Sequence, residues 1–325
     1  PLRRLGGPDP PAARQTEYQM ANRKEVTNQI TSVKNIRQIT RAMEMVAAAR
    51  LRRAETRIEH LRPYAQAMRR MTQRAAAEAG AVSQVPILEQ REDVKRVALL
   101  LITGDRGLAG AFNANILRDG LNRRDELKDE GIETVFYAVG RRGDGALTFR
   151  KAEPKESWTG FTDRPAFSDA REIGESLAAA YIDGEVDRVE VIYNRYVSPL
   201  TQHVQRLTLL PVQEAEVVGA GAEDEGGEEA SGELAEAHSR ASWEYEPEAE
   251  KLLATVIPDY VNTSLYRNLL ESAASELGAR MTAMRSAAEN AETMIDDLTL
   301  EMNRVRQAEI TQEILEVVGG AEALG

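Results

Sequence analysis

The sequence holds one glycine-rich segment at a place where a phosphate group could bind. Gly104, Gly107 and Gly110 follow an apolar run at residues 94–103 and precede a helical pattern. Backbone N–H groups at such a strand-to-helix turn bind the phosphates of nucleotides. The spacing is neither GxGxxG nor a Walker loop, since no Lys-Ser or Lys-Thr pair follows the glycines. A tight turn shaped by its glycines is therefore favoured, and nucleotide binding stays open as an alternative.

Other reactive side chains show no spacing that fits catalysis or metal binding. The chain has no cysteine, which excludes disulfides, thiolate metal ligands and cysteine nucleophiles. His60, His203 and His238 lie far apart in the sequence and do not match metal-ligand spacing. We therefore expect no disulfide, no cysteine nucleophile and no metal site in this chain.

Basic residues concentrate near the N-terminal end. Between residues 20 and 80, thirteen Lys and Arg face five Glu. A basic helix can bind nucleic acid, a membrane surface or an acidic protein. Within residues 22–62, however, no aromatic residues are interleaved to stack on bases, and the basic side chains share their helix with apolar positions. A solvated or protein-facing surface is favoured over nucleic-acid binding.

The elements that position these residues are dominated by a long helix predicted within residues 247–325. From Leu270 to Val305 its apolar residues alternate in steps of four and three, which is a heptad pattern. The main residues of this predicted seam are Leu277, Met281, Met284, Ile295, Leu298, Met302 and Val305. A helix with such a stripe must pack against a second helix. Glu309 occupies the next seam position, so we expect the pairing to stop near it.

A second long helix, predicted at residues 20–62, supplies the partner. Its apolar series includes Ile36, Ile39 and Val46 and is close to a heptad, with a local phase shift near residues 40–47. Pro63 lacks an amide donor, so a kinked, shorter helix and a connection are predicted at residues 63–89. Residues 1–19 contain Pro8, Pro10 and Pro11 with paired glycines and are expected to form a disordered extension, with Met20 as a plausible true start.

The middle of the chain changes to the pattern of an α/β domain, predicted at residues 90–212. Apolar runs indicate buried strands at residues 94–103, 134–139, 186–196 and 203–210, and helical patterns lie between them. The following segment, 213–246, is predicted to be a solvated loop, because residues 214–250 hold thirteen acidic residues against Arg240 alone. No apolar run is long enough to span a membrane.

The order of these parts predicts the topology. If both long helices attach to one compact domain, the first runs towards it and the last runs away, so the two pair antiparallel. The predicted fold class is thus α+β overall, with a long antiparallel two-helix coiled coil and a Rossmann-like α/β globular domain. The last helix extends beyond the first, and its apolar tip consists of Ile310, Ile314, Leu315, Val317 and Val318. An exposed apolar patch of this kind marks an interface.

Several segments together resemble one known family. They are residues 30–53 (ITSVKNIRQITRAMEMVAAARLRR), 62–65 (RPYA), 103–113 (TGDRGLAGAFN), 265–276 (LYRNLLESAASE) and 280–318, which contains MIDDLTLEMNRVRQAEITQEILEVV. In this order they are similar to the gamma subunit of F-type ATP synthases. The resemblance covers nearly everything from Met20 onward and implies a central rotor shaft that couples a membrane ring of c subunits to ATP synthesis or hydrolysis.

The resemblance also implies partners and contact residues. The coiled coil would thread a hexamer of alpha and beta subunits, and the α/β domain would be a foot that meets epsilon and the proton-driven c ring. Contacts with the alpha/beta ring are expected at eight positions: Arg41, Met43, Arg50, Arg52, Arg53, Arg306, Gln307 and Thr311. Catalytic residues, ATP or ADP, and magnesium would belong to partner subunits. The expected location is peripheral, on the cytoplasmic face of a bacterial plasma membrane.

Two other classes of protein remain as alternatives. An unrelated coiled-coil adaptor would share the helical seams but would not need the terminal motifs. A nucleotide-binding α/β enzyme would need a phosphate loop at the glycine-rich turn, and the spacing there does not match one.

Overall fold

The structure is a computed structural model that describes residues 12–79, 87–88, 90–91, 93–212 and 249–322. The chain divides into two compact units, Ala47–Thr282 and the pair of segments Pro1–Val46 and Ala283–Gly325. We call the first the sheet unit and the second the helical unit. The predicted acidic loop lies outside the described residues, as do residues 1–11 and most of the connection before the sheet.

The sheet unit contains a five-stranded sheet. Its strands are β1 (Arg96–Ile102), β2 (Glu133–Val139), β3 (Glu156–Trp158), β4 (Arg188–Ser198) and β5 (Thr201–Leu210). Their order is β3-β2-β1-β4-β5, with parallel pairing except between β4 and β5. The sequence therefore places four of the five strands correctly. It missed β3, because a three-residue edge strand leaves no periodic pattern.

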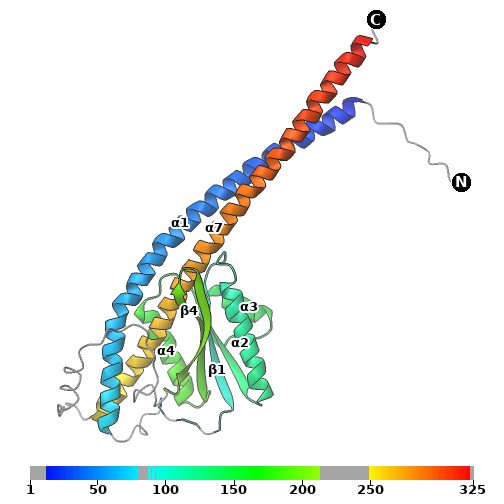
Figure 1. The fold of residues 1–325 in the computed structure, drawn as a ribbon. Coiled ribbons are helices and arrows are strands. Elements are labelled where there is room, and N and C mark those ends of the chain that lie inside the picture. Colours follow the sequence, from blue (N-terminus) through cyan, green and yellow to red (C-terminus); the bar gives the residue numbers. More distant parts are fainter. Residues whose placement is uncertain (1–11, 80–86, 89, 92, 213–248, 323–325) are drawn as a thin grey trace, which may run out of the picture. The chain divides into compact units, whose positions relative to one another are not determined.

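Helices cover both faces of this sheet (Figure 1). One face is covered by α2 (Phe112–Asp129) and α3 (Arg141–Phe149), and the other by α4 (Phe167–Ile182) and the first part of α7 (Ala249–Glu322). In β1 the side chains alternate between the two cores, so that Leu99 packs towards α2 and Leu100 towards α4 and α7. Burial on both faces explains the uninterrupted apolar run of this strand.

The first helix, α1 (Ala12–Ala79), is longer than predicted at both ends. It begins inside the segment expected to be disordered, because residues 12–24 contain no proline or glycine and are rich in good helix formers. It also continues through Pro63 instead of giving way to a second helix. Pro63 is exposed, so water can solvate the carbonyl group of Glu59 that loses its helical donor.

In the helical unit, α1 and α7 pair antiparallel. A cluster of Val26, Ile30 and Ile295 is buried between them, with Leu298 and Met302 packed against it. Ion pairs follow the same reversed order: Arg23 with Glu309 at 3.2 Å, Arg37 with Glu292 at 2.9 Å, and Glu44 with Arg285 at 2.8 Å. The α7 seam is confirmed here, since Met284 and Ile295 are buried, and Val305 is half-buried.

The seam of α1 differs from the prediction. There is no phase shift; the heptad continues through Arg37, Thr40 and Glu44, while Ile36 and Ile39 are exposed. Polar residues occupy these seam positions because opposite charges on α7 pair with two of them. The expectation that pairing stops near Glu309 is likewise wrong, because its carboxylate is buried and bonded to Arg23.

In the sheet unit, the same two helices also pack together. Leu51 and Ala54 of α1 form a buried cluster with Ala274 and Leu277 of α7. Met281, the remaining seam residue of this part, is half-buried. The predicted fold class, a two-helix antiparallel coiled coil with a Rossmann-like domain, is confirmed.

Replacing Pro63 with Ala should raise the free energy of unfolding by about 2 kcal/mol. A restored helical hydrogen bond and the removed clash outweigh the greater freedom of the unfolded chain. Urea unfolding followed by circular dichroism measures this change. As a control for helicity at this place, Ala67→Gly should lower the same free energy by about 1 kcal/mol. A lower stability of Pro63→Ala would contradict the helical geometry described for this segment.

The ion pair between exposed Arg23 and buried Glu309 generates a second prediction. Glu309→Leu should leave the free energy of unfolding unchanged or raise it by about 1 kcal/mol, because an apolar side chain at a seam position needs no desolvated partner. Arg23→Ala should instead lower it by about 1 kcal/mol or more, since the Glu309 carboxylate stays buried without its partner. Equal destabilisation by both substitutions would show that the ion pair itself stabilises the coil.

Candidate functional site

The strand order reverses between β1 and β4, which is where doubly wound sheets bind their ligands. The glycine-rich turn lies at this crevice, directly after β1. The space is filled by the chain itself: a Cβ atom on Gly104 would lie 2.7 Å from the carboxyl group of Glu276 on α7. Glu276 is only 2% exposed. The turn therefore packs against a helix where a nucleotide-binding protein would hold a phosphate.

Asp105 in this turn organises the neighbouring loops. Its carboxylate accepts hydrogen bonds from the backbone N–H groups of Arg141 at 3.1 Å, Gly160 at 2.8 Å and Thr162 at 3.1 Å. Burial alone would raise the pKa of Asp105, but these hydrogen bonds outweigh it and lower the pKa below the ordinary value. Asp105 is thus an ionised acceptor that fixes two loops, not a general acid.

Glu276 has the opposite electrostatic setting. Burial raises its pKa, although the charge and hydrogen bond of Arg280 act against the increase. Arg280 is also buried and donates both to Glu276 and to the carbonyl oxygen of Gly107, the latter at 3.3 Å. The crevice of the sheet thus contains an ion pair contributed entirely by α7.

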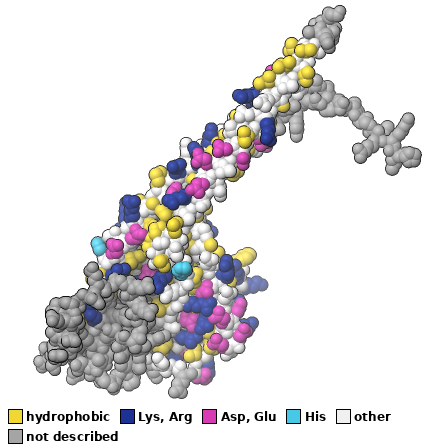
Figure 2. Space-filling view, in the orientation of Figure 1, with side chains coloured by type: hydrophobic (Ala, Val, Ile, Leu, Met, Phe, Trp, Pro, Cys, Tyr) yellow, Lys and Arg dark blue, Asp and Glu magenta, His cyan; other side chains and the backbone are white. Residues whose placement is uncertain are grey.

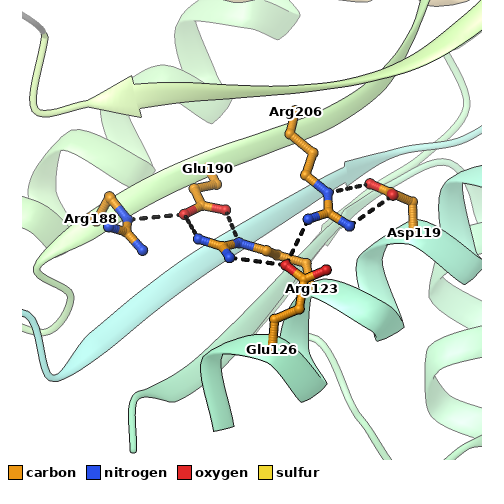
Figure 3. Close-up of polar contacts among 6 residues, drawn as sticks. All are labelled: Asp119, Arg123, Glu126, Arg188, Glu190 and Arg206. Atoms are coloured by element: carbon orange, nitrogen blue, oxygen red, sulfur yellow. Dashed lines mark hydrogen bonds and ion pairs between the residues drawn. The ribbon is translucent and has the colours of Figure 1, made fainter. Parts of the chain in front are cut away.

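A network of charged side chains joins α2 to β4 and β5 (Figure 3). Its members are Asp119, Arg123, Glu126, Arg188, Glu190 and Arg206. Arg206 binds Asp119 through two nitrogens, at 2.8 and 2.9 Å, and donates to Glu126 at 2.8 Å. Hydrogen bonds from Arg206 and then Arg123 hold the pKa of Glu126 below its usual range. The charges balance within the network, so it fixes packing and leaves no excess charge for a ligand.

The part of the chain that the structure describes offers neither a metal site nor a membrane-spanning helix. No cluster of three or more His, Asp or Glu residues there could hold a metal ion. His60 and His203 are both exposed, on α1 and β5. No helix among the described residues is long and apolar enough to cross a membrane.

The predicted basic contact residues lie on α1. In the helical unit Arg41 is exposed and Met43 is half-buried; in the sheet unit Arg50, Arg52 and Arg53 are exposed. Arg50 already has a partner within the chain, because its guanidinium donates to Asp163 at 2.7 Å. The structure brings these side chains to the surface of α1, which is compatible with protein contact.

The predicted contacts near the C-terminal end lie on α7. Arg306, Gln307 and Thr311 are exposed, and the Thr311 hydroxyl donates to the Gln307 carbonyl at 2.8 Å. Beyond them the predicted apolar tip is between 48% and 73% exposed, and hydrophobic side chains gather there (Figure 2). The tip residues are Ile310, Ile314, Leu315, Val317 and Val318. A contiguous exposed apolar surface of this kind calls for a partner.

Sequence reasoning missed a second apolar surface, which we call the α1 stripe. Ile36, Ile39 and Val46 are each more than half exposed, and with half-buried Met43 they recur in steps of three, four and three along α1. Their apolar character alone predicts them to lie in the coil seam. The signal that could have corrected this was the charge pattern, since Arg37 and Glu44 face opposite charges on α7.

Comparison with known protein sequences identifies the relatives of this chain. A family model described as ATP synthase matches residues 22–324. The ATP synthase gamma chain of Rubrobacter xylanophilus is 42% identical over 305 residues, which cover 94% of this chain and 99% of that protein. The gamma chain of Saccharopolyspora erythraea is 40% identical over 321 residues, covering 94% and 98% of the two chains. A gamma chain of Acetobacterium woodii described as sodium ion specific is 41% identical over 309 residues, covering 93% and 99%.

Solved structures share the fold. A chain of the Euglena gracilis mitochondrial ATP synthase matches with a TM-score of 0.62 at 19% identity, covering 94% of this chain and 95% of that one. A chain from the central stalk and c ring of the Tetrahymena thermophila enzyme matches with a TM-score of 0.56 at 24% identity, covering 77% and 99%. The resemblance read from the sequence motifs is confirmed. On the evidence of its family model, its relatives and its fold, the chain belongs to the ATP synthase gamma-chain family.

Proposed function

We propose that this chain, as a gamma subunit in the central stalk of an F-type ATP synthase, turns inside a ring of alpha and beta subunits and couples ion flow to ATP chemistry. The observation that carries this proposal is the exposed apolar surface on the two helices of the coil, the α7 tip and the α1 stripe. A helix pair that buries one seam and leaves a second apolar surface is suited to pass through a larger assembly.

The apolar tip fits the role of a bearing. Apolar contacts have few directional bonds, so a surface such as Ile314, Leu315 and Val317 can turn within a sleeve at low cost. Fixed ion pairs would hold the tip at particular angles. The tip would therefore keep the shaft centred without fixing its orientation.

The basic residues of α1 fit the complementary role of an angle-dependent contact. Exposed Arg41, Arg52 and Arg53 would attract carboxylates of beta subunits, and the strength of this attraction changes as the shaft turns. The ring would also be contacted near the C-terminal end of α7, by Arg306, Gln307 and Thr311. Each orientation of the shaft then favours a different conformation of each beta subunit. Binding of ADP and phosphate, ATP formation and ATP release would follow in sequence, and hydrolysis would run the cycle backwards.

The remaining partners and ligands follow from this role. The sheet unit would be the foot that meets epsilon and the c ring, on the cytoplasmic face of a bacterial plasma membrane. ATP, ADP and magnesium would be held by partner subunits, and this chain would contribute no catalytic side chain. We propose protons as the coupling ion, whereas the name of the A. woodii relative specifies sodium. Measuring ion pumping by the complex with and without Na⁺ distinguishes the two, because a proton-coupled complex should pump without Na⁺.

Recovery of partner subunits tests this function against that of an unrelated coiled-coil adaptor. The tagged chain, purified from its native cells, should recover alpha and beta subunits in a complex that hydrolyses ATP. The physical reason is the large apolar surface that only a surrounding ring would cover. An isolated chain should bind no nucleotide in equilibrium dialysis. Recovery of the chain without alpha and beta subunits would refute the proposal.

Substitutions of the predicted contact residues near the C-terminal end of α7 test the rotor contacts directly. Arg306→Ala and Gln307→Ala should lower the ATPase rate of the assembled complex by about tenfold, because each removes a hydrogen-bonding group that would engage the ring. The control is Glu301→Ala, an exposed charged residue of α7 that points to a different side of the helix from both Arg306 and Gln307. A rate and torque equal to those of the control would remove both residues from the contact set.

A further inference from the structure

We propose that Glu276 and Arg280 form a joint through which torque passes between α7 and the sheet unit. Both are positioning residues: they touch neither nucleotide nor ion but fix α7 to the turn after β1. The inference rests on the proposed rotor function and names the contact within this chain that transmits the torque.

The first observation is the close approach of α7 to the glycine-rich turn. A Cβ atom on Gly104 would lie within 2.8 Å of all three atoms of the Glu276 carboxyl group. Only glycine therefore leaves room for this carboxylate. The side chain fits a recess in the backbone, so α7 cannot slide across the strand ends without withdrawing it.

The second observation is the bonding of Arg280. Its guanidinium is buried and is shared between Glu276, one turn earlier on α7, and the carbonyl oxygen of Gly107 at 3.3 Å. Glu276 fills the start of the turn and Arg280 binds its middle. A buried, charge-assisted hydrogen bond is directional, so it resists shear where an apolar contact would allow sliding.

Neighbouring polar residues of α7 extend the same contact. The Ser275 hydroxyl donates to the Asn194 carbonyl of β4 at 2.9 Å, and the Ser272 hydroxyl donates to the Ile102 carbonyl of β1 at 3.4 Å. Residues 272, 275, 276 and 280 share one face of the helix. This face lies over the carboxyl ends of the two central strands, whereas Leu265 and Leu269 earlier on α7 make apolar contacts with the sheet.

The position of the joint along the chain gives it mechanical importance. The sheet unit ends at Thr282, two residues after Arg280, and α7 continues into the helical unit as one helix. Torque from a ring that turns the sheet unit must leave through α7 and α1. The directional contacts on α7 lie just before that exit, where they hold the helix against the load.

The test uses the complete ATP synthase in membrane vesicles. Glu276→Gln keeps the shape of the side chain but removes its charge, and Arg280→Met keeps its length but removes its hydrogen bonds. We expect ATP hydrolysis to continue at the wild-type rate while ion pumping per ATP hydrolysed is lost. Hydrogen exchange at the amides of Gly104 and Asp105, which are bonded to Asn113 and Thr162, should become about tenfold faster in the intact complex.

Arg267→Gln is the matched control. Arg267 and Glu271 form another ion pair one turn apart on α7, at 2.9 Å, and Glu271 is buried. Its loss disturbs the same helix without touching the glycine-rich turn, so pumping per ATP should stay at the wild-type value. A size-exchange variant adds a test of geometry: Gly104→Ala should uncouple the complex, and the double change Gly104→Ala with Glu276→Asp should restore pumping.

The outcomes separate this inference from the rotor function itself. Unchanged pumping per ATP in Glu276→Gln and Arg280→Met would overturn the joint and leave the rotor function standing. Hydrolysis and pumping that fall in the same proportion, so that pumping per ATP stays at the value of the Arg267→Gln control, would show a purely structural pair and also overturn it. If the double change Gly104→Ala with Glu276→Asp did not restore pumping, the close fit of Glu276 against Gly104 would not be what couples α7 to the turn, and the joint would be overturned. Absence of pumping in the wild-type complex would instead refute the rotor function.

Discussion

The structure depends on one constraint: neither long helix can bury its apolar seam alone. The seam of α7 runs from Leu270 to Val305, and α1 provides the only comparably long helix among the described residues. Packing the two antiparallel removes both seams from water, as the buried cluster around Ile30 and Ile295 shows. The cost is that a two-helix pair has only one inner side. In the helical unit, further apolar residues must therefore face outward, and the α7 tip and the α1 stripe are the result.

Charged side chains set the register of the two helices in this coil, which apolar packing alone does not determine. A heptad seam of similar apolar residues can slip by one repeat with little loss, because each position resembles the one before it. The pairs Arg37–Glu292 and Glu44–Arg285 make such a slip costly, since it would separate both pairs at once. This explains why the seam of α1 tolerates polar residues, and why Ile36 and Ile39 are free to form a separate surface.

The limits of prediction from the sequence follow from the same physics. The α7 seam was predictable because it repeats one period over many residues, and four strands were predictable because strands buried on both faces give short apolar runs. The α1 seam was not, because hydrophobicity alone cannot show that Arg37 is paired and Ile36 is exposed. Pro63 was misleading for another reason: its cost falls where water can solvate the freed carbonyl, and exposure is a tertiary property. The filled crevice was also invisible, since Gly104 and Glu276 are far apart in the sequence.

The filled crevice shows how a common fold can serve a purpose other than ligand binding. Reversed strand order creates a hollow at the ends of β1 and β4 in any doubly wound sheet. Where a nucleotide occupies that hollow, the protein gains chemistry; here the chain's own Glu276 and Arg280 occupy it, and the protein gains rigidity. Desolvating two charges costs free energy, so a buried ion pair such as this one is better explained by a property other than stability. Resistance to shear is such a property, because it requires directional bonds, and apolar packing does not supply them.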